Sequence, residues 1–236
     1  MTQPAPAIEV TNLRKRYGRT WALRGLDLRV EAGEAVCVLG PNGSGKSTLL
    51  RLLGTAARPT SGEVRVLGFS IRADSDAIRR RVGFLPDRPY LYAELTALEN
   101  LRFAAVMYGL DRTEGALRHA IAAAGLGHVA DARVRTFSRG MAQRLSLART
   151  MLHDPELVLL DEPYNALDAE GLQLVDRFVA DLRRTGKTAL VVTHQVERGL
   201  ALCDRAVALR AGRVAFDGPA ASFTASPAAG DLREWA

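Results

Sequence analysis

The chain has 236 residues, of which 47% are hydrophobic and 25% charged, so it can bury a core and is not a disordered protein. No apolar run approaches the roughly 18–20 residues that span a bilayer, and residues 1–8 lack the pattern of a signal peptide, which predicts a cytoplasmic protein. If it works at a membrane, it does so through a partner chain. The basic residues behind the net charge of +6 are dispersed, and all but three of the 32 are arginine; we therefore expect no nucleic-acid partner.

Strand and helix patterns alternate at both ends of the chain. Strands are predicted at 8–10, 23–30, 35–39 and 63–67, with a helix at 46–53. Apolar residues then recur with helical spacing over 98–108, 117–124 and 145–152. Strands return at 157–160, 189–192, 206–209 and 213–216, with helices at 169–184 and 196–202. The pattern predicts an α/β core at 1–87 and 154–218, a helical subdomain inserted at 88–153, and a loosely ordered tail at 219–236.

A glycine-rich loop follows the predicted strand at 35–39 and precedes the helix at 46–53. It fits the motif G-x-x-x-x-G-K-[ST] with Gly40, Pro41, Asn42, Gly43, Ser44, Gly45, Lys46 and Ser47. The glycines let successive N–H groups point at phosphate oxygens, and the helix N-terminus adds a partial positive charge. Such a lysine contacts the β- and γ-phosphates, and the Ser47 hydroxyl binds Mg²⁺. Thr48 is expected to support the helix or the α-phosphate.

Two carboxylates close the apolar strand at 157–160. Asp161 can hold Mg²⁺ through water, and Glu162 can polarise the attacking water. A strand that ends in Asp-Glu is a weak signal alone, but it becomes strong beside a phosphate loop. Lys46 and Glu162 are therefore the predicted catalytic residues, and Ser47 and Asp161 the predicted metal ligands.

The segment 137–144 has two interpretations. By itself it is a capped helix start, with Ser138 as the N-cap. Beside the motifs above, its residues Ser138, Arg139, Gly140 and Met141 resemble the signature loop of the ABC-type ATPases, where Leu-Ser-Gly-Gly-Gln is usual. The resemblance extends from about Ile8 to Gly218, in the family's order.

This resemblance implies a P-loop NTPase core with a mixed β-sheet, and ATP with Mg²⁺ as cofactors. Tyr17 looks like the aromatic residue that stacks on adenine, and His194 like the switch histidine that contacts the γ-phosphate as a catalytic residue. Family members pair head to tail, so Ser138 and Gly140 of one subunit would cap the ATP on a second subunit. Asp168, in the D-loop at 165–168, would cross that interface.

Several positions depart from the family's pattern. Arg139 and Met141 replace the first glycine and the glutamine of the signature loop. Asp87 stands where a glutamine is usual, and its shorter, anionic side chain can still bind Mg²⁺ or the water of the ion. Gln195 follows His194, where an acidic residue is frequent.

The spacing of the motifs favours one branch of the family. The 92 positions from Lys46 to Ser138 (138 − 46) leave no room for the coiled coil of chromosome-maintenance or repair relatives. The resemblance therefore implies the ATPase subunit of a membrane transporter, at the cytoplasmic face of the membrane, with a separate transmembrane permease. The segment 87–92 would line the docking groove, although its residues 90–92 could equally pack inside the subdomain.

The transported substrate is inferred from short similarities. The segments 95–101, 161–164, 168–171 and 193–195 are similar to the haem-exporter ATPase of cytochrome c maturation, so we expect an exporter, with haem as its substrate. A drug or lipid exporter and a soluble ABC-type ATPase in translation or repair stay open. A regulatory module that does not hydrolyse ATP is disfavoured by the intact Lys46, Asp161 and Glu162.

Overall fold

The computed structural model describes residues 5–224 and residue 226. It contains two β-sheets, with strand orders β2-β1-β4-β5 and β10-β9-β3-β8-β7-β6. The four-stranded sheet is antiparallel and consists of β1 (Ile8–Tyr17), β2 (Thr20–Val30), β4 (Ser61–Val66) and β5 (Phe69–Ser70). The six-stranded sheet consists of β3 (Ala35–Leu39), β6 (Val82–Leu85), β7 (Leu157–Asp161), β8 (Thr188–Val192), β9 (Arg205–Arg210) and β10 (Arg213–Pro219).

The six-stranded sheet is mixed, as predicted. Its strands β6, β7, β8, β3 and β9 pair in parallel, and β10 pairs antiparallel with β9. The central strands β3, β7 and β8 are buried at every residue, because both faces of the sheet are covered there. Val36 and Val38 pack in one apolar cluster with α1 (Lys46–Leu53) and the four-stranded sheet, whereas Cys37 packs in another with α6 (Ala169–Arg184), α7 (Val196–Leu202) and α8 (Ala220–Phe223).

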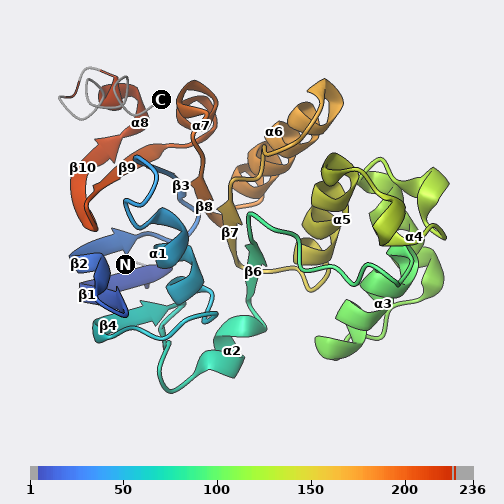
Figure 1. The fold of residues 1–236 in the computed structure, drawn as a ribbon, viewed down its shortest axis with the longest axis horizontal. Coiled ribbons are helices and arrows are strands. Elements are labelled where there is room, and N and C mark those ends of the chain that lie inside the picture. The colour runs from blue at the N-terminus through green and yellow to red at the C-terminus, as the bar shows by residue number, and fades with distance from the viewer. Residues whose placement is uncertain (1–4, 225, 227–236) are drawn as a thin grey trace.

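A third apolar cluster belongs to the helices of the middle segment. These are α3 (Ala97–Met107), α4 (Glu114–Ala123) and α5 (Arg139–Met151), with 3-10 turns η1 (Gly127–Val129) and η2 (Val134–Thr136). Figure 1 shows α3, α4 and α5 gathered at one end of the molecule, away from the four-stranded sheet. As the capping pattern predicts, α5 begins after Ser138, whose Oγ accepts a hydrogen bond from the Met141 N–H at 3.2 Å.

Some elements differ from the sequence predictions. The helices at 46–53, 169–184 and 196–202 are confirmed, but α2 (Ser75–Arg79), β5 and β6 were not predicted because they are too short to show a periodicity. A loosely ordered tail from 219 is wrong for the segment 220–223, which forms α8 and fully buries Phe223. Residues 225 and 227–236 lie outside the described part of the chain.

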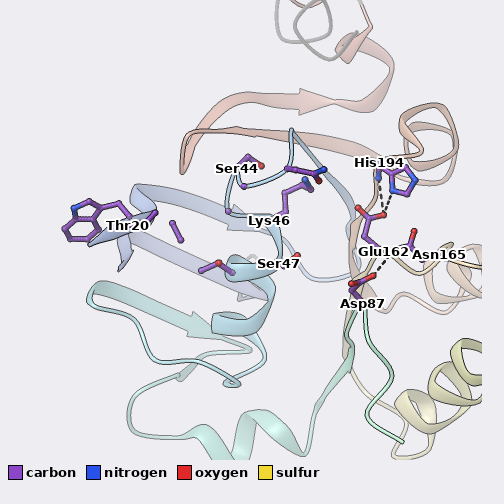
Figure 2. A pocket seen from close by; sticks show the side chains of 14 residues that line it. Thr20, Ser44, Lys46, Ser47, Asp87, Glu162, Asn165 and His194 are labelled. Atoms are coloured by element: carbon purple, nitrogen blue, oxygen red, sulfur yellow. Dashed lines mark hydrogen bonds and ion pairs between the residues drawn. The ribbon is translucent and has the colours of Figure 1, made fainter. Parts of the chain in front are cut away.

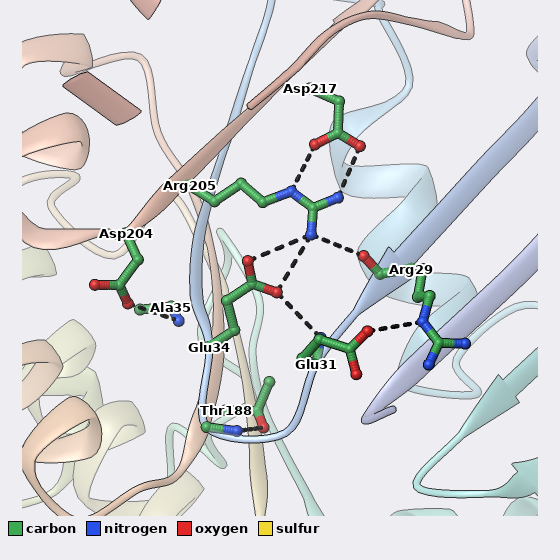
Figure 3. Close-up of polar contacts among 9 residues, drawn as sticks. Arg29, Glu31, Glu34, Ala35, Thr188, Asp204, Arg205 and Asp217 are labelled. Carbon is green, nitrogen blue, oxygen red and sulfur yellow. Dashed lines mark hydrogen bonds and ion pairs between the residues drawn. The ribbon is translucent and has the colours of Figure 1, made fainter. Parts of the chain in front are cut away.

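Arg205 on β9 joins the two sheets (Figure 3). Its Nε and Nη2 donate to the Asp217 carboxylate on β10 at 2.5 and 2.7 Å, and its Nη1 donates to the Arg29 carbonyl on β2 at 3.0 Å. Glu34, before β3, accepts from the same Nη1 at 3.3 Å. The carboxylates raise the pKa of Arg205, so it stays charged and fixes the β1–β2 hairpin against the central sheet.

Among residues 5–224 and 226, no helix has both the length and the apolar character that crossing a bilayer requires.

Candidate nucleotide-binding site

A cavity of about 500 Å³ lies between the glycine-rich loop and the carboxyl ends of β6, β7 and β8. Such an edge of a parallel sheet is where ligands bind in open α/β folds. Figure 2 shows Ser44, Lys46 and Ser47 on one side of the cavity, and Asp87, Glu162, Asn165 and His194 on the other. The structure therefore brings together predicted site residues that lie up to 152 positions apart (194 − 42).

The glycine-rich loop connects β3 to α1 through backbone conformations that favour glycine. Gly45 has φ +108°, and a Cβ atom there would lie 2.7 Å from the Ala22 carbonyl oxygen. Gly40 has φ +142°, and its Cβ would lie 2.3 Å from the Leu209 carbonyl oxygen. Each position thus needs glycine for its backbone angle and for its packing against a neighbouring strand.

Polar groups of this loop are arranged for an anion. The Lys46 Nζ donates to the carbonyls of Gly40 and Pro41 at 2.7 and 3.0 Å, which holds the cation at the loop. Burial lowers the pKa of Lys46, while Glu162 and Asp161 act in the opposite direction. The Ser44 Oγ is buried without a hydrogen-bond partner. Helix α1 has no side-chain cap, unlike α3, α5 and α6, so its N-terminal N–H groups are open to a phosphate.

The predicted metal ligands Ser47 and Asp161 lie in contact. The Ser47 Oγ donates to the Asp161 Oδ1 at 3.0 Å, and Asp161 is 1% exposed. Burial raises the pKa of Asp161 against the lowering effect of the Ser47 hydrogen bond, and the charges of Glu162 and Asp87 add to the rise. A hydroxyl and a carboxylate fit Mg²⁺, which takes its other ligands from phosphates and water. The described residues contain no group of three or more His, Cys, Asp or Glu side chains that could hold a metal.

Asp87 lies on the opposite side of the cavity from Ser47. Its Oδ1 accepts a hydrogen bond from the Asn165 Nδ2 at 2.8 Å (Figure 2). The metal role of Asp87 stays a prediction. Asn165 lines the same cavity but was not among the predicted site residues. Its position in a D-loop does not indicate that its side chain faces the phosphates.

Glu162 and His194 form a pair across the ends of β7 and β8. The Glu162 Oε2 accepts from the His194 Nδ1 at 2.8 Å and from the His194 backbone N–H at 3.2 Å. Glu162 has φ +52°, a left-handed conformation that is costly for a side chain of this kind and is concentrated at functional sites. The Glu162 side chain is 16% exposed and that of His194 is 65% exposed, so the carboxylate lies largely inside the protein while the imidazole faces solvent.

Tyr17, the residue predicted to stack on adenine, is not among the residues that line the cavity. It is the last residue of β1, and the Lys15 Nζ lies 4.6 Å from the centre of its ring. Thr20, Trp21 and Ala22, from the start of β2, line the cavity instead. The sequence carried a signal for Trp21, a second aromatic residue four positions after Tyr17, but the hairpin decides which of the two residues lies at the cavity.

Ser138 and Gly140 also do not line the cavity of their own chain. Ser138 is exposed at the start of α5, and a Cβ on Gly140 would lie 2.8 Å from the Ala166 carbonyl oxygen. Their predicted contact with a nucleotide therefore requires a second chain.

Comparisons with known proteins agree with this geometry. The family described as ABC transporter matches residues 23–165. The chain is 37% identical over 218 residues to the Nod factor export ATP-binding protein I of Rhizobium meliloti (strain 1021), covering 92% of this chain and 65% of that protein. It is 36% identical to the daunorubicin/doxorubicin resistance ATP-binding protein DrrA of Streptomyces peucetius, covering 98% of this chain and 71% of that protein.

Solved structures show the same fold. A dimeric ATP-binding cassette, MJ0796, in a post-hydrolysis state bound to ADP and Pi, superposes with a TM-score of 0.84 at 30% identity, covering 90% of this chain and 98% of that one. The ATP-binding subunit of an ABC transporter superposes with a TM-score of 0.86 at 28% identity, covering 97% of this chain and 98% of that one.

Proposed function

Because the chain belongs to the ABC transporter family and folds as its ATPase cassette, we propose that it hydrolyses ATP to power an exporter. The single observation that carries this proposal is the cavity in which the Lys46 loop faces the Glu162–His194 pair. The names of the Nod factor and DrrA relatives support the direction of transport. A phosphonates import ATP-binding protein, PhnC of Anaeromyxobacter dehalogenans, is 40% identical to this chain. The relatives therefore include an importer, and the choice of export over import needs a test.

The geometry gives each residue a task. The triphosphate would lie on the N–H groups of the loop and α1, with Lys46 against the β- and γ-phosphates. Mg²⁺, held by Ser47 and Asp161, would supply positive charge at the phosphate oxygens. Glu162 would accept a proton from the attacking water, because its carboxylate is an acceptor at the cavity wall. His194 would hold that carboxylate in position through Nδ1 and, after moving, contact the γ-phosphate.

The site is proposed to be completed by a second copy of the cassette. Ser138 lies away from the cavity of its own chain, so only another subunit could bring the start of α5 to the γ-phosphate. Mixing Ser138→Arg and Lys46→Ala subunits tests this. Each homodimer has two broken sites, whereas the heterodimer has one intact composite site, so partial recovery of ATPase activity is expected. Loss of ATP binding by isolated Ser138→Arg subunits would contradict assembly in trans.

A permease is proposed to dock on the surface of residues 90–107. Five large apolar side chains are exposed there, namely Tyr90, Tyr92, Phe103, Val106 and Met107, each at 43% or more. The rings of Tyr92 and Phe103 lie 4.9 Å apart, so the patch is continuous between the loop after β6 and α3. Leu91, by contrast, packs against the core of the helical subdomain proposed at 88–153. An exposed apolar patch of this kind indicates an interaction site, and the proposed location of the cassette is the cytoplasmic face of the membrane.

For the exported substrate we propose three candidate classes, namely haem, drugs and lipids. Haem stays a candidate through the similar segments at 95–101 and 193–195, but none of the relatives named above is a haem exporter. The test begins by capturing the permease from membranes with a tagged Glu162→Gln chain. The complex of that permease with the parent chain is then reconstituted in vesicles and offered haem, drug and lipid substrates. Export of one of them with ATP consumption would support the proposal, and ATP-driven uptake instead of export would refute it.

A further inference from the structure

The Asp87–Asn165 hydrogen bond joins two loops on the far side of the cavity. Asp87 follows β6, and Asn165 lies in the turn after β7, where its backbone N–H donates to the Glu162 carbonyl at 3.1 Å. Since β6 and β7 are paired in parallel, with Leu85 opposite Leu160, their loops emerge side by side. The turn fixes the Asn165 backbone, and the amide then reaches across to the Asp87 carboxylate at 2.8 Å.

This bond is the one side-chain hydrogen bond that Asp87 makes among the described residues. Asp87 is an exposed side chain, so without the amide its carboxylate could turn to solvent. In the position that Asn165 gives it, the carboxylate lines the same cavity as Ser47, whose Oγ donates to the buried Asp161. The negative charge of Asp87 therefore acts on the place where Ser47 and Asp161 would hold a cation.

We propose that Asn165 is a positioning residue, which holds the Asp87 carboxylate at the edge of the cavity so that its charge strengthens the Mg²⁺-dependent part of nucleotide binding. The proposal rests on the proposed function, because it needs a nucleotide on the Lys46 loop. It assigns to Asn165 a task that depends on an anionic partner at position 87. Removing either partner should weaken binding of the nucleotide with its metal, and should not weaken binding of the nucleotide alone.

The sign of the charge effect separates this proposal from a general loss of structure. ATP without metal is a polyanion, so the Asp87 carboxylate repels it. When Mg²⁺ is bound with the nucleotide, the same carboxylate attracts the metal ion. Asp87→Asn is therefore expected to leave metal-free ATP binding unchanged or slightly tighter. A damaged fold would weaken both.

The test measures the Kd of ATP by calorimetry with excess Mg²⁺ and with EDTA, for the full chain. The ratio of the Kd in EDTA to the Kd with Mg²⁺ is expected to fall about fivefold in Asn165→Ala and in Asp87→Asn. Each variant removes a hydrogen bond to a charged group. The double variant is expected to lose no more than either single variant, because both changes break one interaction. The swap Asp87→Asn/Asn165→Asp restores a donor–acceptor pair but leaves no carboxylate at position 87, so it should not recover the ratio. Arg72→Ala, an exposed change outside the cavity, is the control.

The proposal is overturned if Asn165→Ala leaves the ratio within twofold of the parent, or if the losses of the single variants multiply in the double variant. Failure of the proposed function has a different signature, because then the parent itself would bind ATP weakly in both conditions and independently of Lys46.

Discussion

The two walls of the nucleotide cavity are built in different ways. One wall includes the continuous segment 42–48, whose Lys46 is held by the carbonyls of Gly40 and Pro41 just before it. The other wall comes from loops after three parallel strands, and each of its pairs, Asp87–Asn165 and Glu162–His194, joins two loops. The first wall depends on local backbone geometry, whereas the second depends on strand register. We therefore expect changes in the first wall to affect nucleotide binding with or without metal, and changes in the second to affect turnover or the Mg²⁺-dependent part of binding.

The largest effect is expected from Glu162→Gln in the second wall. The amide keeps the size of the side chain but cannot accept the proton of the attacking water, so the hydrolysis rate should fall by about 10²–10⁴-fold. ATP binding should persist, and the ATP-bound dimer should accumulate in size-exclusion chromatography. Phosphate release at the parent rate would show that Glu162 is not the base.

Lys46→Ala tests the first wall and should act on affinity instead. Charge-assisted contacts with the triphosphate contribute about 1.5–3 kcal/mol, so ATP affinity should fall more than tenfold in calorimetry. His194→Ala is the matched control from the other wall, and it should keep ATP affinity while slowing hydrolysis. Equal affinity of Lys46→Ala and the parent would refute the role of the loop.

The backbone of the first wall can be tested by two glycine substitutions. Gly45→Ala combines φ +108° with a Cβ 2.7 Å from the Ala22 carbonyl oxygen, so it should lower the free energy of unfolding by about 1–3 kcal/mol. Gly43→Ala has φ +79° but open space around its Cβ, so about 1 kcal/mol is expected from the backbone angle alone. Urea titration of both variants measures the difference, and equal losses would mean that packing against Ala22 adds nothing.

The smallest effect is expected at the adenine end of the cavity. Trp21 lines the cavity and Tyr17 does not, so Trp21→Ala should weaken ATP binding more than Tyr17→Ala does. Loss of a ring–ring contact is worth about 0.5–1.5 kcal/mol, a few-fold change in Kd. Inorganic triphosphate, which has no base, is the control ligand and should bind both variants equally. A larger loss in Tyr17→Ala would restore the assignment that the family resemblance implied.

Much of the site was predictable because its signals are local. The loop at 40–47 requires glycines at fixed offsets. The apolar run at 157–160, directly before Asp161 and Glu162, indicates a buried strand. The helix of Ser138 was equally visible, since an N-cap bonds to an N–H three residues away. Short elements such as β6, with four residues, carry too few positions to show a period.

The sequence by itself determined the longer elements, the phosphate loop and the family, since each of these depends on residues close together in the chain. The tertiary structure decided which side chains meet. Pairing of β7 with β8 places Asp161 opposite Val192 and so brings Glu162 to His194, and pairing of β6 with β7 brings Asp87 to Asn165. The register of the β1–β2 hairpin places Trp21, and not Tyr17, at the cavity. Register is set by packing across the whole sheet, because a slip of one residue turns every side chain to the other face.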